Sequence, residues 1–300
     1  MLSFLKSLNF TLPMAFVLGL SFPSISQFTK SLSIPILALV MTVSLYKIPT
    51  KNMLQIKRLI KPMLIGILLS YVIVGSIMII LTNFLISDDS LRIGMMLVAA
   101  TPPGVTVIPF AVLLSGNIDF ALFALFGTYI ASLLITPLLT ILLTSAQTFP
   151  LSGLLYNLIY LIVLPIIFSR LLHIKKISPF IEKWQSTIIN WGFSLVVLTV
   201  IGLNQKSFFN DFNNLYRISL IAFSTSFPLF YIFKYFFNKI NVKPDDSISM
   251  ILISTIKNPI FASTLAMDLF DDSAISIPGA IVCACYSIYM LWLGKHKSHS

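Results

Sequence analysis

Two segments inside apolar stretches carry the residues of this chain that are best able to bind an ion or a polar ligand. Thr101-Pro102-Pro103-Gly104 interrupts one apolar run, and Lys257-Asn258-Pro259 interrupts another. A proline leaves a helix carbonyl without its hydrogen-bond partner, and lipid cannot supply one. Such a break therefore persists only against protein or a water-filled cavity, where unwound backbone can bind polar groups. A pair of broken helices is typical of secondary transporters.

The candidate binding residues are small polar groups, turn residues and one lysine at these two breaks. They are Thr101, Pro103, Gly104, Thr106, Ser254, Thr255, Lys257, Asn258 and Pro259. We assign none of them as catalytic and none as a metal ligand. For a single hydroxyl, a hydrogen bond to the carbonyl one turn back is the more common role, whereas the set together favours a binding site. Asn258 is the stronger candidate among the neutral residues, because a buried amide needs several partners.

Lys257 carries the most specific signal. An ammonium at bilayer depth costs several kcal/mol unless it meets water, a counter-charge or backbone carbonyls. We expect no side-chain carboxylate beside it, because every acidic residue lies in a loop or at the end of an apolar stretch. The acidic residues are Asp88, Asp89, Asp119, Glu182, Asp211, Asp245, Asp246, Asp268, Asp271 and Asp272.

Three functional interpretations of Lys257 stay open. Its ammonium can replace a bound cation and be held by helix-end carbonyls. It can face a cavity and pair with a substrate carboxylate or sulfonate, helped by the helix N-termini after the breaks. It can also carry a proton through a transport cycle. The alternative without function is a lysine that snorkels to the membrane surface, or a span misplaced by one turn.

The composition requires a membrane protein. Hydrophobic residues make up 57% of the 300 residues and charged residues 10%, which excludes a soluble globular domain. Apolar stretches of about 18 to 25 residues predict ten transmembrane helices. They cover residues 8–23, 31–46, 62–86, 92–115, 120–144, 151–173, 186–203, 213–237, 247–270 and 275–294. We interpret the first as a retained helix rather than a secretory signal, because Pro13 lies inside it and no clear cleavage site follows.

The basic residues predict the orientation of these spans. Fifteen Lys and Arg residues fall on the side of the N-terminus and four on the other side. This positive-inside asymmetry predicts a multi-pass protein of the cytoplasmic membrane with both termini in the cytoplasm. Because the net charge of +10 is spread over loops, we expect no nucleic-acid partner.

The spans are arranged as a duplication. The third span at 62–86 matches the eighth at 213–237, and the broken fourth span matches the broken ninth. We therefore predict an all-α membrane protein of two five-helix repeats, residues 1–147 and 148–300. Because five is odd, the second repeat is inverted and the two broken helices cross near the midplane. We expect the basic connections at 47–61 and 174–185 to lie on the cytoplasmic surface as amphipathic helices.

Short motifs along the chain resemble the bile acid:sodium symporter family. They are Leu12-Pro13 through Gly19, Phe22-Pro23, Leu69-Ser70-Tyr71-Val72-Ile73, Pro103-Gly104-Val105-Thr106, Thr136-Pro137-Leu138-Leu139-Thr140, and Asn258 with Ala262. The family belongs to a superfamily that includes permeases of the auxin-efflux-carrier type and arsenite carriers. The resemblance implies a ten-helix carrier with a panel domain, a core domain that holds the crossed helices, and alternating access for organic anions, usually coupled to sodium.

This chain departs from the family pattern where the resemblance implies sodium ligands. Hydrocarbon side chains or a lysine replace most of the expected oxygen donors. The altered positions are Val107, Ile108 and Pro109 after the first break, Ala121 and Leu125 in the fifth span, Ile253 or Ser254 in the ninth, and Lys257 and Ser70, which each replace a glutamine. Sodium needs several hard oxygen ligands. We therefore expect no sodium coupling and no cofactor.

These residues together predict a secondary carrier or facilitator for a small or amphipathic organic anion, embedded in a lipid bilayer. Three alternatives stay open: a permease of the auxin-efflux-carrier type, a sodium-coupled symporter with divergent ligands, and a receptor or scaffold that does not transport. An enzyme is not expected, because the H-E-x-x-H motif is absent and no base stands near a nucleophile within the spans.

Overall fold

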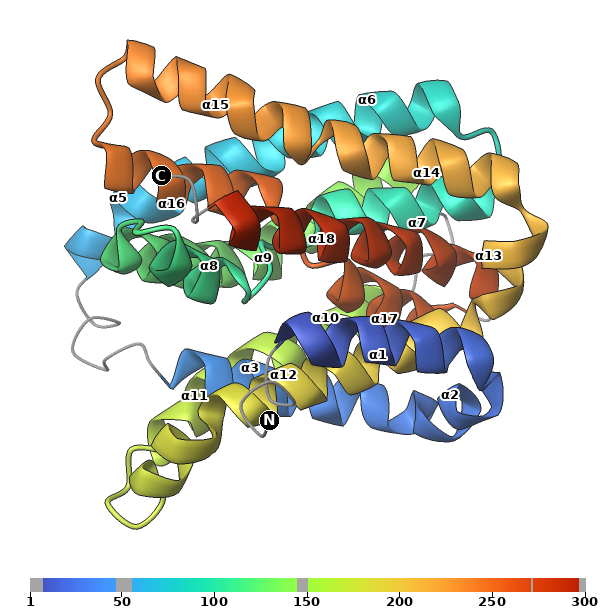
Figure 1. Ribbon diagram of the computed structural model, residues 1–300, viewed down its shortest axis with the longest axis horizontal. Coiled ribbons are helices and arrows are strands. Elements are labelled where there is room, and N and C mark those ends of the chain that lie inside the picture. Colours follow the sequence, from blue (N-terminus) through green and yellow to red (C-terminus); the bar gives the residue numbers. More distant parts are fainter. Residues whose placement is uncertain (1–7, 47–55, 145–150, 271, 297–300) are drawn as a thin grey trace.

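The computed structural model describes residues 8–46, 56–144, 151–270 and 272–296 of the chain. Within these ranges the protein is helical and forms no strand, apart from one isolated bridge. Seven helical segments are long and apolar enough to cross a membrane (Figure 1). They are Pro23–Leu45, Lys57–Leu85, Ile118–Leu142, Leu151–Leu171, Ser178–Leu203, Phe212–Lys239 and Ser273–Lys295. The expectation of an all-α, multi-pass membrane protein is therefore confirmed.

The first half of the chain contains the elements up to the long helix α9. In order they are α1 (Leu8–Ser21), α2 (Pro23–Thr29), η2 (Lys30–Leu32), α3 (Ser33–Leu45), α5 (Ile56–Ile67), η3 (Leu68–Gly75), α6 (Ser76–Leu85), α7 (Asp89–Ala100), α8 (Val107–Leu113) and α9 (Ile118–Thr144).

The second half continues with helices of similar length and order. They are α10 (Leu151–Leu158), η4 (Ile159–Val163), α11 (Leu164–Leu171), α12 (Ser178–Leu203), α13 (Gln205–Asn210), α14 (Phe212–Ser224), α15 (Phe227–Lys239), α16 (Pro244–Thr255), α17 (Pro259–Leu269), η5 (Ser273–Ser276) and α18 (Ile277–His296).

The other three predicted spans are helical but shorter than a membrane is thick. The apolar part of α1 covers Phe10–Ser21. The predicted fourth and ninth spans are each divided in two, into α7 with α8 and α16 with α17. A 12-residue helix such as α7 rises only about 18 Å, so each half must meet its continuation inside the protein.

Two predicted surface helices are wrong in the described part of the chain. Residues 178–185 are the first turns of α12, which begins with Ser178-Pro179, because proline is favoured in the first turn of a helix. Ile181 is buried there against Val43 and Tyr46. Residues 56–61 are likewise the start of α5, and residues 47–55 lie outside the described ranges. The second span also begins earlier than predicted, at Pro23.

Two stretches of π-helix were not predicted. They are η3 (Leu68–Gly75), between α5 and α6, and η4 (Ile159–Val163), between α10 and α11. Single π-turns are uncommon within α-helices and often occur at functional sites. The longer of the two, η3, packs against α16 and α7.

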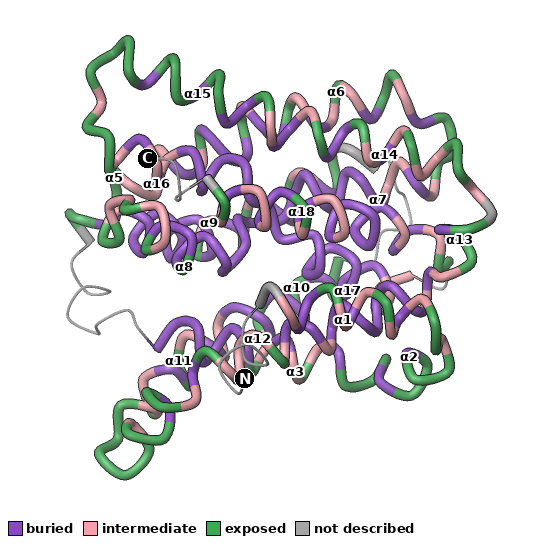
Figure 2. Tube along the Cα trace, viewed as in Figure 1, coloured by how far each residue is buried: buried purple, intermediate pink, exposed green. Residues whose placement is uncertain are grey.

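The helices form two groups that differ in burial. One group contains α1, α3, α11 and α12, which pack on one another in the lower part of Figure 1. The other contains α7, α9, α16, α17 and α18, whose central turns are largely buried (Figure 2). The two broken helices therefore lie in the most enclosed part of the molecule.

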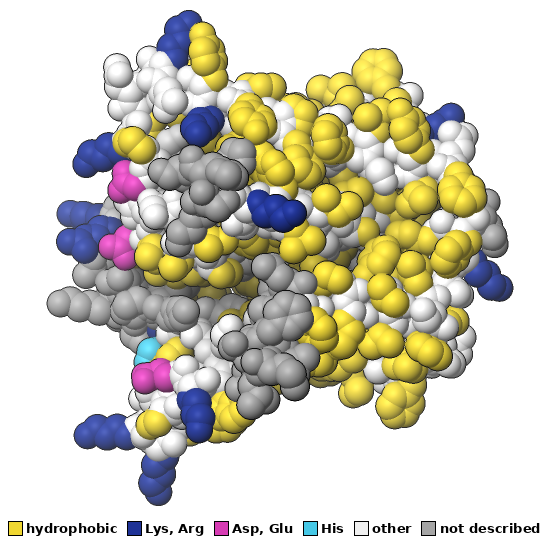
Figure 3. Space-filling model, in the orientation of Figure 1, with side chains coloured by type: hydrophobic (Ala, Val, Ile, Leu, Met, Phe, Trp, Pro, Cys, Tyr) yellow, Lys and Arg dark blue, Asp and Glu magenta, His cyan; other side chains and the backbone are white. Residues whose placement is uncertain are grey.

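Charged side chains gather at the two ends of the molecule, with an apolar band between them (Figure 3). The end at the left of Figure 1 holds the α11–α12 and α15–α16 connections, and the last turns of α18 point toward it. We call it the basic end. Its described basic residues are Lys57, Arg58, Lys61, Arg170, Lys175, Lys176, Lys183, Lys234, Lys239, Lys243 and Lys295. Exposed apolar side chains on the helices, such as Phe84 on α6 and Leu134 on α9, are suited to contact lipid.

Candidate functional site

The two broken helices meet at their breaks. Pro103 and Lys257 form an isolated antiparallel bridge, and the Gly104 backbone N–H donates a hydrogen bond of 2.9 Å to the Ile256 carbonyl. A side-chain Cβ at Gly104 would stand 3.0 Å from the Lys257 carbonyl oxygen. Glycine therefore allows the two unwound backbones to approach this closely. We call the paired segments 101–106 and 256–258 the crossover.

The helices break here for local reasons. Thr101 takes an extended conformation (φ −77°, ψ 152°) because the following Pro102 disfavours the helical region. Asn258 precedes Pro259 and is also non-helical (φ −107°, ψ 75°). The Asn258 side-chain oxygen then accepts a hydrogen bond of 3.2 Å from the Phe261 N–H, which caps the first turn of α17.

Lys257 projects from the crossover into protein and is only 1% exposed. Its Nζ donates to the Thr101 carbonyl at 2.9 Å and to the Ser70 hydroxyl at 3.2 Å. It also stands 4.4 Å from the centre of the Tyr71 ring. Each hydrogen bond from a charged donor contributes about 1.5–3 kcal/mol, and a desolvated cation–π contact contributes about 2 kcal/mol. Three electron-rich partners of this kind suit an ammonium.

No carboxylate lies within ion-pair distance of Lys257 in the ranges that the structure describes. The helix-end carbonyl of Thr101 takes the place of a counter-ion. These contacts match the interpretation in which a tethered ammonium replaces a bound cation. They do not match a snorkelling lysine, whose head group would be exposed.

The other predicted site residues divide into two sets. The hydroxyls of Thr101, Ser254 and Thr255 donate to carbonyls one turn back, those of Val98 and Ile251, which is the common role of such groups. The structure brings Pro103, Gly104 and Asn258 together at the crossover, and Pro259 occupies the first turn of α17. Thr106 lines a cavity whose lining does not include Lys257.

Replacing Asn258 with alanine is expected to lower the free energy of unfolding by about 1 kcal/mol, the usual value of a helix N-cap. The substitution also removes the Nδ2 hydrogen bond to the Tyr129 hydroxyl at 3.3 Å. Thermal unfolding of the purified protein measures the change. Asn258→Ser should recover much of the loss because serine also caps helices, and equal stability of all three proteins would contradict this role of Asn258.

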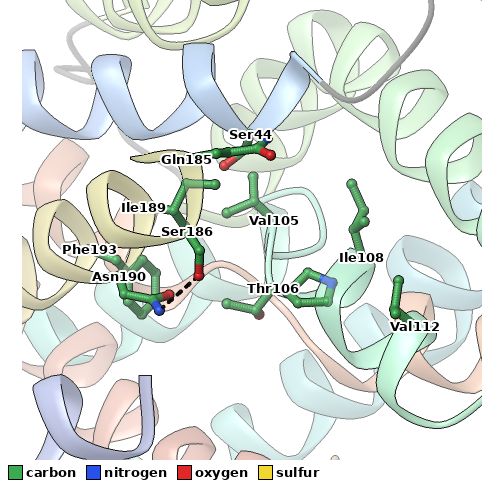
Figure 4. Close-up of a pocket in the computed structure, with 11 residues that line it drawn as sticks. Ser44, Val105, Thr106, Ile108, Val112, Gln185, Ser186, Ile189, Asn190 and Phe193 are labelled. Atoms are coloured by element: carbon green, nitrogen blue, oxygen red, sulfur yellow. Dashed lines mark hydrogen bonds between the residues drawn. The ribbon is translucent and has the colours of Figure 1, made fainter. Parts of the chain in front are cut away.

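A cavity lies between the crossover and the helix group that contains α3 and α12 (Figure 4). It is in the half of the molecule nearer to the basic end. Its empty volume is ≈ 680 Å³, part of it open to solvent. One wall comes from the α8 region and the other from α3 and α12. The lining residues are Ser44, Val105, Thr106, Ile108, Pro109, Val112, Gln185, Ser186, Ile189, Asn190 and Phe193. We call it the inner cavity.

The inner cavity combines an apolar surface with a few neutral hydrogen-bonding groups. Among the described residues its lining includes no charged side chain, and Lys257 is not part of it. The Gln185 amide donates to the Val43 carbonyl at 2.9 Å, and the Asn190 amide lies 3.5 Å from the Ser186 hydroxyl (Figure 4). Such a surface suits an amphipathic ligand whose polar group accepts hydrogen bonds. The interpretation in which Lys257 faces this cavity does not match the geometry.

Sequence reasoning missed most of the inner cavity. Gln185 falls at the end of the segment that we predicted as a surface helix, 174–185. Ser186 and Asn190 fall in the first turns of the predicted span, 186–203. The signal was present, since residues 186 and 190 are one helical turn apart and 185 adjoins them. Tyr71 was also missed, because nothing in its apolar segment predicts that its ring lies beside Lys257.

Comparison with known proteins identifies the family of the chain. A family model described as the sodium bile acid symporter family matches residues 34–211, which is more than half of the 300 residues. No curated protein matches the chain significantly. The matched region contains α7, α8 and the residues of the inner cavity, and the helical, membrane-spanning structure agrees with it. The chain belongs to the sodium bile acid symporter family.

Proposed function

We propose that this protein is a secondary carrier for a small or amphipathic organic anion, that it works by alternating access, and that it does not couple transport to sodium. The family contains membrane transporters, and the chain has several membrane-spanning helices. A transporter of the bile-acid-symporter type is therefore the starting point, and the substrate class and the coupling are the parts that we add.

The observation that carries the proposal is the contact of the Lys257 ammonium with Thr101 and Ser70. The family resemblance implies glutamines and a bound sodium ion at this place. Here a covalently attached cation already contacts the helix-end carbonyl and a hydroxyl. A sodium ion beside it would be repelled, since two unit charges 4 Å apart repel by about 4 kcal/mol at an effective dielectric constant of 20.

The positions that the resemblance assigns to other sodium ligands also support the absence of coupling. Ala121, Leu125 and Ile253 are 0% exposed, and their side chains carry no oxygen. At Ser254, the alternative to Ile253, the hydroxyl already donates to the Ile251 carbonyl at 2.7 Å. Val107 is likewise buried. A buried hydrocarbon surface cannot replace the water that sodium loses on binding.

Two features support two inverted five-helix repeats, residues 1–147 and 148–300. Helices α7 and α16 each contain 12 residues and end at a break, and both start points and end points are 155 residues apart. The hydrogen bonds at their first turns correspond as well. Asn117, before α9, donates to Asp246 in α16, and Ser90 in α7 donates to Asp272, before η5. Asn117 and Asp272 are 155 residues apart in the chain, and Ser90 and Asp246 are 156 residues apart.

The proposed repeats define the two parts that move. The group with the crossover corresponds to a core domain and the group of α1, α3 and α12 to a panel domain, with the inner cavity between them. By the positive-inside rule, we propose that the basic end faces the cytoplasm. Both termini then lie on the cytoplasmic side of the cytoplasmic membrane. In this arrangement the inner cavity lies on the cytoplasmic side.

The lining of the inner cavity supports an anion over a cation as substrate. It offers hydroxyl and amide donors from Thr106, Ser186 and Asn190, and the part of the lining that the structure describes includes no carboxylate. We propose that the other predicted site residues act mainly by supporting the site and moving with it. They are Thr101, Pro103, Gly104, Ser254, Thr255, Lys257, Asn258 and Pro259. The lipid bilayer is the other partner, and no cofactor is required.

Thermal stability of the detergent-solubilised protein tests this function. A panel of monocarboxylates, organic sulfonates and bile salts, with uncharged amides as controls, is measured in sodium chloride and in potassium chloride. A ligand at 100 times its dissociation constant adds about 2.7 kcal/mol. We expect one class of anion to stabilise the protein equally in both salts. Stabilisation only in sodium would indicate a sodium symporter with divergent ligands, and stabilisation by no anion would contradict the proposed substrate class.

A further inference from the structure

A second cavity lies at the end of the molecule opposite the basic end. It is open to solvent and lies between α2, η2 and the start of α3 on one side and α17 on the other, and its empty volume is ≈ 640 Å³, part of it outside the protein surface. The lining residues are Gln27, Lys30, Ser31, Ser33, Ile34, Thr264, Met267 and Asp268. We call it the outer cavity.

The outer cavity repeats the inner cavity at a constant sequence spacing of 155 residues, as from Lys30 to Gln185. Residues at this spacing line both cavities. On one wall they come from η2 and α3 in the outer cavity and from α12 in the inner cavity, and on the other wall they come from α17 and α8, respectively. The pairs are Lys30 with Gln185, Ser31 with Ser186, Ile34 with Ile189, Thr264 with Pro109, and Met267 with Val112. Two cavities built from equivalent positions of two repeats are expected to receive the same ligand.

Thr264 gives an independent sign of a ligand. Its side chain is 1% exposed and lines the outer cavity, yet its hydroxyl has no hydrogen-bond partner among the described residues. A buried hydroxyl without a partner destabilises the fold unless a ligand supplies the missing hydrogen bond. The equivalent position in the inner cavity is Pro109, which has no such group, so the hydroxyl is not a requirement of the repeated fold.

The two cavities differ in charge. Lys30, whose side chain is exposed at the outer cavity, stands where Gln185 stands in the inner one. The one acidic side chain in the outer lining is Asp268, and its Oδ2 already accepts a hydrogen bond of 2.7 Å from the Asn157 amide. The outer cavity thus contains an ammonium, one carboxylate that already accepts a hydrogen bond, and a buried hydroxyl without a partner, whereas the described lining of the inner cavity contains only neutral groups.

We propose that the outer cavity is an anion-binding site for the carboxylate or sulfonate group of the transported molecule, held by the Lys30 ammonium and the Thr264 hydroxyl. This inference rests on the proposed function. Because Gln185 replaces Lys30 in the inner cavity, the anion is held more tightly outside than inside. The asymmetry favours capture from the outer side and release into the cytoplasm.

Cysteine labelling tests the outer site without knowledge of the substrate. Ser31→Cys and its repeat equivalent Ser186→Cys are made in a protein with Cys283→Ala and Cys285→Ala. Each is reacted with the anionic 2-sulfonatoethyl methanethiosulfonate and with its cationic trimethylammonium analogue. We expect the ratio of anionic to cationic rates to be roughly 3- to 10-fold higher at Ser31→Cys. Lys30→Gln should remove this difference, and Lys206→Gln, a neutralised exposed lysine at the same end, should not.

Protection by methanesulfonate tests the hydroxyl. It should slow labelling of Ser31→Cys by the anionic reagent, and the protection should be lost with Thr264→Val and kept with Thr264→Ser. Equal rate ratios at the two cysteines, or equal effects of Lys30→Gln and Lys206→Gln, would overturn the proposal. Since labelling needs no transport, such a result would leave the proposed carrier function standing, whereas failure of the thermal panel would affect that function itself.

Discussion

Replacing Lys257 with methionine is expected to reduce transport at least about 10-fold while leaving the protein folded. Methionine fills a similar volume, so packing is largely kept. The substitution leaves the Thr101 carbonyl and the Ser70 hydroxyl without a donor, at about 1–3 kcal/mol each. It also removes a buried charge, which offsets that loss. Stability should therefore change little, whereas the cation that joins the two broken helices is gone.

Counterflow in proteoliposomes and thermal unfolding measure these two effects separately. Lys234→Met provides the control, because it removes an exposed lysine on α15 that lies outside the crossover, and it should transport as the wild type does. Wild-type transport by Lys257→Met would show that the tethered ammonium is not needed. A variant that fails to fold would assign Lys257 a structural role instead of a transport role.

Replacing Gly279 with valine is expected to lower the free energy of unfolding by about 3 kcal/mol and to disrupt the crossover. A Cβ at Gly279 would lie 2.6 Å from the Pro259 carbonyl oxygen and would overlap the Ser263 hydroxyl. Both contacts belong to the first turns of α17. Because backbone cannot yield as a flexible side chain does, α18 and α17 must move apart, and overpacking of this kind costs about 1–3 kcal/mol or more.

Gly294→Val is the matched control on the same helix. The atom nearest to a Cβ at Gly294 is Leu113 Cδ2, at an ordinary contact distance of 4.0 Å. Thermal unfolding should therefore separate the two variants clearly. Equal midpoints for Gly279→Val and Gly294→Val would mean that α17 and α18 do not pack as closely as described.

Much of the fold follows from the sequence because proline and apolar length act locally. Pro102-Pro103 and Pro259 stop helices wherever they occur in the chain, so the two breaks could be predicted. The same locality explains the errors. The predicted span at 186–203 rests on hydropathy alone. Hydropathy does not indicate that Ser178-Pro179 can start the helix earlier. It also does not indicate that Ile181 is buried against α3.

The surroundings of Lys257 could be predicted only in part. The distribution of acidic residues indicated a partner other than a carboxylate, and the Thr101 carbonyl agrees with that. The contacts with Ser70 and Tyr71 depend on how the π-helical turns of η3 orient them, and no sequence pattern specifies a π-helix. Which residues contact Lys257 therefore depends on packing between segments that are distant in the sequence.

A buried polar row on α9 is a signal that sequence reasoning could have used. Thr128, Ser132, Thr136 and Thr140 recur every four residues and are 0% exposed. Residues four apart share one helix face, so such a row in an apolar span indicates contact with protein. Thr136 donates a hydrogen bond of 2.7 Å to the Ala100 carbonyl at the end of α7, which directs this row toward the crossover.

Transport without sodium is decided by counterflow in proteoliposomes that contain the purified protein and an anion chosen from the thermal panel. The external and internal solutions contain potassium or choline as the only cation, and parallel vesicles contain sodium. The tethered ammonium predicts that the anion accumulates at the same rate in all three solutions and that Lys257→Met abolishes accumulation in each. Counterflow that appears only with sodium would contradict the assignment of Lys257 as a replacement for the bound cation.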